Sequence, residues 1–283
     1  MNTLLHRRIT VALALAGALS LCATSSIAAP QRTLTVCADP NNLPFSNKAQ
    51  QGFENRIMSL IARELGARIE YVWWAQRRGY VRNTLSESRC DVWPGVAVGV
   101  DRVVTTHPYY RSTYVFVTRK EQPLSGLSLD DARLRDLSIG VQMVGNDAMN
   151  TPPAHAVARR GMIDNVRGFM LYGDYTRPNP PAAIVDAVAS EKVDVAMVWG
   201  PLAGYFASRS TVPLRLEPVT PASDGPQWPM TYAIGMGTKR ENEALREQID
   251  AILNRRKSSI EAILREYHVP LLDTGGASVA VNR

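Results

Sequence analysis

The residues most able to contact a ligand lie just after runs that have the pattern of buried strands. The stretch TVCADPNNLPFSN, residues 35–47, passes from an apolar run into Asp39, Asn41 and Phe45. Carboxylate, amide and aromatic groups at a strand end suit ligand binding. Asp39 and Asn41 have an alternative role in a chain turn, because Asp and Asn side chains form Asx turns. Phe45 has an alternative role in core packing. The sequence leaves these alternatives open.

Similar residues follow other predicted strands. Trp74 and Arg77 come at and after the end of the run at residues 69–74, and Gly95 and Arg102 lie in or after the run at 91–98. Arg102 is the strongest candidate for an anion ligand, because a guanidinium group binds carboxylates in a bidentate manner. A surface ion pair is the alternative for Arg102, solvation for Arg77 and core packing for the neighbouring Trp73.

Two more candidates come from the second half of the chain. Gln142 ends the predicted strand at residues 137–142, and Trp199 follows the predicted strand at residues 193–198. In open parallel α/β sheets, ligands bind beyond the carboxyl ends of the strands, so all these positions fall at the expected edge. A buried structural role is the alternative for Trp199.

The sequence contains no motif for enzymatic or metal chemistry. A P-loop, a Gly-x-Ser-x-Gly elbow and a His-Glu-x-x-His zinc motif are all missing. Beyond the leader, the histidines are His107, His155 and His268, none at metal-ligand spacing from another. We therefore expect no catalytic residue, no metal site, no cofactor and no enzyme.

The first 28 residues are predicted to be a secretory signal peptide. Arg7 and Arg8 precede an apolar run at residues 9–21, and small residues around Ala28 fit a cleavage site. Cys22 raises the alternative of a lipid anchor, which the bulky Leu21 before it disfavours. The apolar run is shorter than the roughly 20 residues of a membrane span. We expect a periplasmic protein without a membrane span.

The remaining chain is mildly basic. The 283-residue sequence has a formal net charge of +6, and loss of the two leader arginines leaves +4. These charges are scattered, so the sequence shows no nucleic-acid-binding surface. Cys37 and Cys90 are the two cysteines beyond the leader. Outside the cytoplasm such a pair often forms a disulfide, but two buried thiols are equally compatible with the sequence.

The elements predicted around these residues alternate between strand and helix. Strands are expected at residues 34–38, 69–74 and 91–98, with helices at 53–65 and 79–86 between them. This order predicts a parallel sheet. An extended run at 109–118 and a polar break follow, and a capping box is expected at 128–131. The alternation then restarts, with strands at 137–142, 166–171 and 193–198 and helices at 152–161 and 181–190. An extended run at 230–236 and helices at 243–253 and 259–267 complete the predicted elements.

The chain resembles the type II periplasmic solute-binding proteins of the amino-acid-binding kind. The motifs that carry this resemblance are LTVCADPNNLPFSN, GFENRIMSLIARELG, IEYVWWAQRRG, CDVWPGV and VASEKVDVAMVWGPLAGYF, in that order. The resemblance implies two α/β lobes with a ligand cleft between them and two crossover strands. Lobe one would comprise residues 29–118 and 226–270, lobe two residues 119–225, and residues 271–283 a flexible tail.

Four strings give a narrower resemblance, CADPNNLPFSN, GFENRI, WWAQRRG and PYYRSTYVFV. They are similar to the binding-protein-like component of the MoxJ/XoxJ type, which is associated with quinoprotein (PQQ) methanol dehydrogenases. This resemblance implies a periplasmic accessory role in the maturation, activation or binding of a PQQ-dependent alcohol dehydrogenase. The dehydrogenase is thus the expected partner, beside a small-molecule ligand.

Two departures from the amino-acid binders concern the cleft. Arg102 matches the arginine that holds the ligand's carboxylate, but Trp199 stands where an acid usually holds the ligand's ammonium group. An unpaired ammonium in a closed cleft is costly, so we do not expect a free amino acid as ligand. Two other functions stay open: a solute-binding component of an ABC importer for a small polar or anionic molecule, and a dehydratase of small carboxylic acids.

Overall fold

The computed structural model describes residues 32–77, 79–100, 103–144, 150–171 and 175–272. The predicted signal peptide, Arg102 and residues 273–283 of the expected tail lie outside these ranges. At residues 271 and 272 the tail is not free, because the Leu272 N–H donates to the carbonyl of Arg111 (3.0 Å).

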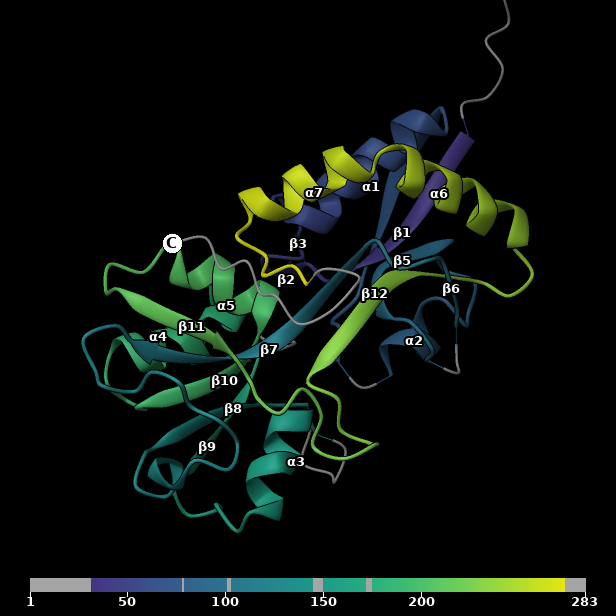
Figure 1. Ribbon diagram of the computed structural model, residues 1–283. Helices are drawn as coiled ribbons and strands as arrows, with labels where there is room; N and C mark the ends of the chain where they lie inside the picture. Colours follow the sequence, from purple (N-terminus) through teal and green to yellow (C-terminus); the bar gives the residue numbers. More distant parts are fainter. Residues whose placement is uncertain (1–31, 78, 101–102, 145–149, 172–174, 273–283) are drawn as a thin grey trace, which may run out of the picture. The chain divides into compact units, whose positions relative to one another are not determined.

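Ten of the described strands form one mixed sheet, with the order β4-β1-β5-β12-β7-β10-β8-β9, in which β11 also pairs with β7 and β6 with β12 (Figure 1). A separate short hairpin joins β2 to β3. The strands are β1 (Arg32–Ala38), β2 (Asn41–Asn42), β3 (Ser46–Asn47), β4 (Ala67–Trp73), β5 (Val92–Ala97), β6 (Val104–Thr105), β7 (Tyr110–Arg119), β8 (Ile139–Met143), β9 (Val166–Met170), β10 (Val195–Trp199), β11 (Leu214–Pro218) and β12 (Thr231–Thr238).

The sheet is only partly parallel. Strands β4, β1 and β5 run parallel to one another, as do β9, β8 and β10, and these are the strands of the two predicted β-α-β runs. Strand β12 is antiparallel to β5 and β7, and β10 is antiparallel to β7. The predicted parallel pairing is therefore found within each β-α-β run. Strands β7 and β12 lie in the runs predicted only as extended, and they pair antiparallel because no β-α-β connection constrains them.

Strand β7 divides its pairing between two sets of strands. Residues 110–113 pair with β12, whereas residues 114–118 pair with β10, and β11 pairs along 115–119. We call β4, β1, β5, β12 and β6 the first strand group, and β10, β8, β9 and β11 the second strand group. A strand shared in this way fits the predicted crossover, while the predicted lobe boundaries at residues 118 and 225 remain predictions.

Helices cover each strand group. Helices α1 (Phe53–Glu64), α6 (Glu243–Arg255) and α7 (Lys257–Glu266) contact one another, and Figure 1 shows them together. Of the three, α1 and α6 contact strands of the first group. Helices α3 (Pro152–Arg159), α4 (Ala183–Ala189) and α5 (Gly200–Ala207) contact the second group. The short elements are α2 (Tyr80–Asn83) and the 3₁₀ helices at Ala132–Arg135 and Pro180–Ala182.

Local sequence explains where several elements end. Helix α1 stops before Gly66, whose φ of +63° is the left-handed conformation that glycine adopts at no cost, as its position predicted. The capping box expected at residues 128–131 is wrong. Asp131 instead caps a 3₁₀ helix by accepting the Arg133 N–H (2.9 Å). The helix expected at 79–86 is only four residues long. It ends at Asn83, and the hydroxyl of the following Thr84 donates to the Tyr80 carbonyl (2.6 Å).

Candidate functional site

The residues expected at the cleft lie at or near the carboxyl ends of their strands. Because β1, β4 and β5 are parallel neighbours, the loops after β1 and β4 meet at one edge of the first group. Gly95 lies inside β5 rather than after it, and Gln142 lies in β8. The residues placed in this way are Asp39, Asn41, Phe45, Trp74, Arg77 and Gly95 in the first half, and Gln142 and Trp199 in the second.

Asp39 is buried and joins the two neighbouring loops. Its Oδ1 accepts the N–H of Asn41 (2.8 Å), which makes the Asx turn that the sequence allowed, and its Oδ2 accepts the N–H of Gln76 (2.6 Å). Burial raises the pKa of Asp39, and the two backbone N–H groups oppose that rise. Its carboxylate thus has a structural role, and ligand contact by Asp39 or Asn41 stays a prediction.

Phe45 is half-buried and packs on the first turn of α1. Its ring contacts the fully buried Phe53 edge-on, with centroids 5.3 Å apart. Phe53 in turn packs on Tyr110 and Tyr267, so this ring belongs to an aromatic cluster that fastens the loop to α1 and α7. Phe45 therefore packs in the core where its ring contacts Phe53, as the core-packing alternative predicted.

Trp74 and Arg77 differ in burial. Trp74 is half-buried, packs beside the cluster around Tyr80, and carries the Arg89 guanidinium over its ring at 5.3 Å. Arg77 is exposed. Trp74 therefore stabilises the loop after β4, and Arg77 is the more accessible of the two for a ligand or a partner.

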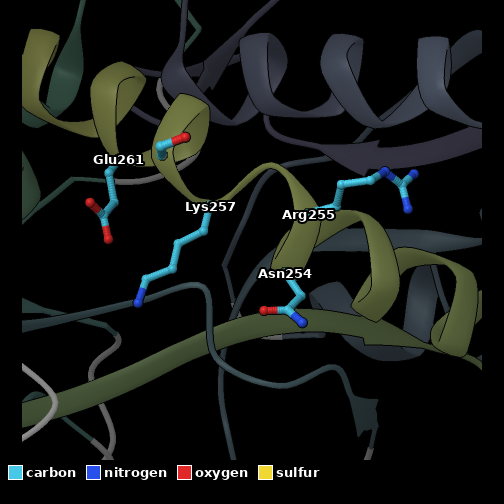
Figure 2. A pocket seen from close by; sticks show the side chains of 5 residues that line it. Asn254, Arg255, Lys257 and Glu261 are labelled. Atoms are coloured by element: carbon cyan, nitrogen blue, oxygen red, sulfur yellow. The ribbon is translucent and has the colours of Figure 1, made fainter.

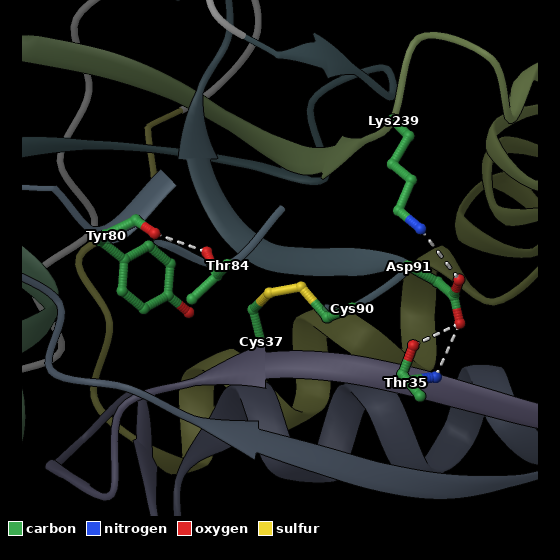
Figure 3. Close-up of a disulfide and its surroundings, with 7 residues drawn as sticks. All are labelled: Thr35, Cys37, Tyr80, Thr84, Cys90, Asp91 and Lys239. Atoms are coloured by element: carbon green, nitrogen blue, oxygen red, sulfur yellow. Dashed lines mark hydrogen bonds and ion pairs between the residues drawn. A yellow bond between two sulfur atoms is a disulfide. The ribbon is translucent and has the colours of Figure 1, made fainter. Parts of the chain in front are cut away.

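A disulfide lies beneath these loops. Cys37 in β1 and Cys90 before β5 are joined, with their Cα atoms 5.6 Å apart and both side chains fully buried (Figure 3). Beside it, Asp91 accepts the hydroxyl of Thr35 (2.6 Å) and lies 3.9 Å from the Lys239 ammonium. These bonds link β1 to the start of β5. Of the two states that the sequence allowed for Cys37 and Cys90, the structure contains the disulfide.

Glu54 is a buried acid that the sequence analysis did not single out. It lies in the first turn of α1 with 4% of its surface exposed, and a Cβ on Gly95 would overlap its carboxyl group. Burial raises its pKa to about 8, and the neighbouring charge of Asp39 adds to the rise. Its spacing from Ile57 and Ile61 places an acid on the apolar face of the helix, which is the signal that could have revealed it.

In the second strand group, Trp199 fills space between aromatic rings. It is half-buried at the end of β10, with ring centroids 5.3 Å from Tyr114 of β7 and 5.9 Å from Tyr232 of β12. Gln142 is buried, and its carbonyl accepts the hydroxyl of Thr151 (2.7 Å), which starts α3. Trp199 thus packs against one tyrosine from each of β7 and β12, two strands that pair with each other.

Large apolar side chains are exposed near the strand ends. We call five of them the exposed apolar set: two follow β5, one follows β8, one ends β9 and one lies beyond β9. They are Val98, Val100, Val144, Met170 and Tyr175, between 36% and 56% exposed. Because Met143 and Met170 are register partners, Val144 and Met170 lie at neighbouring strand ends. Large exposed apolar residues of this kind are candidates for a surface that binds a partner.

A separate surface pocket lies at the corner between α6 and α7. Its lining is polar, and Figure 2 shows the side chains around the turn. It is lined by Asn254, Arg255, Lys257, Ser258 and Glu261, none of which is an expected cleft residue. Among the described residues, no group of three or more His, Cys, Asp or Glu could hold a metal ion, and no helix is long and apolar enough to cross a membrane.

Comparison with known proteins identifies the family. Residues 34–270 match the model of the bacterial extracellular solute-binding proteins, family 3. The chain belongs to this family.

Individual relatives are more specific. The family 3 chain is 35% identical over 247 residues to Protein MoxJ of Methylorubrum extorquens, covering 85% of this chain and 82% of that protein. It also resembles the crystal structure of the periplasmic binding protein XoxJ from Methylobacterium extorquens AM1, with 35% identity, a TM-score of 0.69, and coverage of 85% and 99%. MxaJ from Methlophaga aminisulfidivorans matches with 26% identity, a TM-score of 0.73, and coverage of 84% and 100%.

These matches confirm the predicted fold and the predicted MoxJ/XoxJ resemblance. The two-lobe α/β expectation is that of family 3. The sheet is mixed because β12 is antiparallel to β5 and β7, and β7 is antiparallel to β10. The roles of the individual cleft residues in this family 3 protein remain predictions.

Proposed function

We propose that this protein is a periplasmic, non-enzymatic accessory factor that binds a PQQ-dependent alcohol dehydrogenase and aids its maturation or activation. The observation that carries the proposal is the 35% identity to MoxJ over 85% of the chain. The collinear strings CADPNNLPFSN, GFENRI and WWAQRRG fall in the same loops and helix that form the candidate site.

The described site supports a protein contact better than tight binding of an amino acid. Trp199 stands in place of the expected ammonium partner and is packed between Tyr114 and Tyr232, so this position offers an aromatic surface rather than a charge. The exposed apolar set adds apolar area at the strand ends, and protein interfaces bury such area at their centres.

Co-purification with the dehydrogenase tests the proposal. The mature protein should retain the dehydrogenase at low micromolar concentration, either as the apo form or as the PQQ-loaded form. Retention of only one form would tell whether the contact belongs to maturation or to the active enzyme. Retention of neither form would contradict the proposal.

Membership of family 3 favours a second function, the solute-binding component of an ABC importer for a small polar or anionic molecule. A ligand that binds the native state raises the melting temperature by mass action. A thermal-shift screen of amino acids, organic acids and alcohols would therefore support this function if one solute stabilised the protein strongly and the dehydrogenase did not bind.

A further inference from the structure

The chain that follows helix α7 contacts both strand groups, and we call its residues 267–272 the post-α7 segment. On the side of the first group, the hydroxyl of Ser112 donates to the Pro270 carbonyl (2.6 Å), and the Leu272 N–H donates to the Arg111 carbonyl (3.0 Å). Both bonds are made to the part of β7 that pairs with β12. The segment is therefore attached to the first group.

Helix α5 of the second group packs closely on the same segment (Figure 1). Gly200 and Gly204 are four residues apart and so lie on one face of this helix. A Cβ at Gly204 would overlap the His268 carbonyl oxygen. A Cβ at Gly200 would lie 3.3 Å from Cγ of Pro270 and 2.6 Å from the Thr113 carbonyl oxygen. The contact between helix and segment thus leaves no room for a side chain at Gly204.

Two stacked tyrosines continue this contact. The rings of Tyr205 in α5 and Tyr267 in the post-α7 segment are stacked, with centroids 5.7 Å apart and planes at 13°. The Arg209 guanidinium lies over the Tyr205 ring at 3.6 Å, and that of Arg56 in α1 lies over the Tyr267 ring at 5.7 Å. Both tyrosines are buried, and the Tyr267 hydroxyl donates to the Gln51 carbonyl (2.6 Å). Offset rings and guanidinium groups over rings attract each other, so these contacts join the two groups.

The apolar core is also continuous across the groups. One cluster of buried apolar side chains includes Leu34 of β1 and Ile57 of α1 from the first group, and Val188 of α4 and Leu202 of α5 from the second. Domains that move against each other share small, polar interfaces, and binding proteins close around ligands by bending between such domains. A bend in this protein would instead have to separate buried apolar surfaces.

A second link between the groups lies in the loop after β1. The side-chain amide of Asn41 donates to the carbonyl of Arg177, which lies between β9 and α4 (2.8 Å). Strand β2 also contacts the 3₁₀ helix at Pro180–Ala182, which leads into α4. The two groups are therefore linked at two places that are far apart in the sequence.

We propose that the post-α7 segment holds the two strand groups at one fixed angle, so that this protein does not close around a solute by hinge bending. The exposed apolar set, whose members come from both groups, is then presented as one fixed surface. The inference does not depend on the dehydrogenase, because it concerns contacts within a single chain.

Distances between the two groups test this proposal in the mature protein. A nitroxide-bearing non-natural amino acid would replace Ala158 of α3 and Ala244 of α6, which are both exposed, so that the disulfide stays intact. Double electron–electron resonance should give one narrow distance distribution. The distribution should not change when L-arginine, L-glutamate or citrate is added.

Two variants should release the groups. Gly204→Ala displaces the His268 carbonyl and should at least about double the width of the distribution, because a freed hinge samples several angles. Tyr205→Leu keeps apolar volume but removes the ring stack, and it should broaden the distribution less. Should Gly204→Ala not fold, Tyr205→Leu carries the comparison. Val141→Ala is the matched control, since it removes buried methyl groups within the second group and should lower stability without changing the width.

Four results would overturn the inference. They are a broad or two-peaked distribution in the wild type, a distance that shifts with an added solute, an unchanged distribution in every folded variant of the segment contact, and an equal broadening in Val141→Ala. None of these measurements uses the dehydrogenase, so failure of this inference is distinguishable from failure of the proposed function.

Discussion

At the scale of single residues, the candidate site depends on one small residue and one buried acid. Gly95 was expected at the cleft because it lies in or after the strand predicted at residues 91–98. The structure places it inside β5 and gives a physical reason for glycine there, since any Cβ would overlap the Glu54 carboxyl. Glu54 itself was not predicted, because a glutamate in the first turn of a helix is explained by the helix dipole alone. Its burial depends on strands distant in sequence.

The buried Glu54 predicts how stability changes with pH. Because its folded pKa of about 8 lies above the ordinary 4.5, the folded state holds this proton while the unfolded state loses it. The free energy of unfolding should fall as pH rises from about 5 to 8, by up to about 1.4 kcal/mol per pH unit from this group. Glu54→Gln should lose this slope, as measured by urea unfolding across that range. Equal slopes in both proteins would contradict the assignment.

The contact between Gly95 and Glu54 predicts a coupled pair of substitutions. Gly95→Ala should destabilise the protein by about 1–3 kcal/mol, the usual cost of overpacking a filled site. In a Glu54→Ala background the same change should cost much less, because the overlapping carboxyl is gone. Chemical denaturation of the four proteins in this double-mutant cycle measures the coupling. Additive effects of the two changes would show that the residues do not touch.

At the scale of elements, the strands and helices that repeat as β-α-β units could be predicted, and those that pair across the chain could not. The apolar periodicity of residues 53–65 and the run at 193–198 correspond to α1 and β10. Strand β11 was missed because it lies in a stretch rich in Pro, Thr and Ser, and it forms only through its pairing with β7. Tertiary context decides such strands, so propensity alone is a weak guide.

The disulfide gives a prediction at this scale. It links β1 to the start of β5 across a sequence separation of 53 residues, beneath the two loops that carry Asp39 and Trp74. Replacing both Cys37 and Cys90 by alanine should lower stability by about 2–5 kcal/mol. Dithiothreitol should lower the melting temperature of the wild type and leave that of the double variant unchanged. A double variant as stable as the wild type would show that the bond is not needed for the fold.

At the scale of the whole molecule, the fold belongs to solute-binding proteins while parts of the site fit a protein partner. Trp199 and the exposed apolar set give aromatic and apolar surface near the strand ends of both groups. Position at a strand end was enough to select Asp39, Phe45 and Trp199 from the sequence. It could not distinguish a ligand contact from a turn or a packed ring, because that depends on neighbours from other elements.

The most direct test of the account is the affinity of the mature protein for the PQQ-dependent alcohol dehydrogenase, measured by biolayer interferometry with apo and PQQ-loaded enzyme. We predict saturable binding to at least one form. Val98→Asp and Met170→Asp should each weaken it at least about tenfold, or about 1.4 kcal/mol, as for charges placed in an apolar interface. Ile163→Asp, at an exposed apolar residue outside the set, should not. No binding to either form, or equal effects of all three variants, would contradict the account.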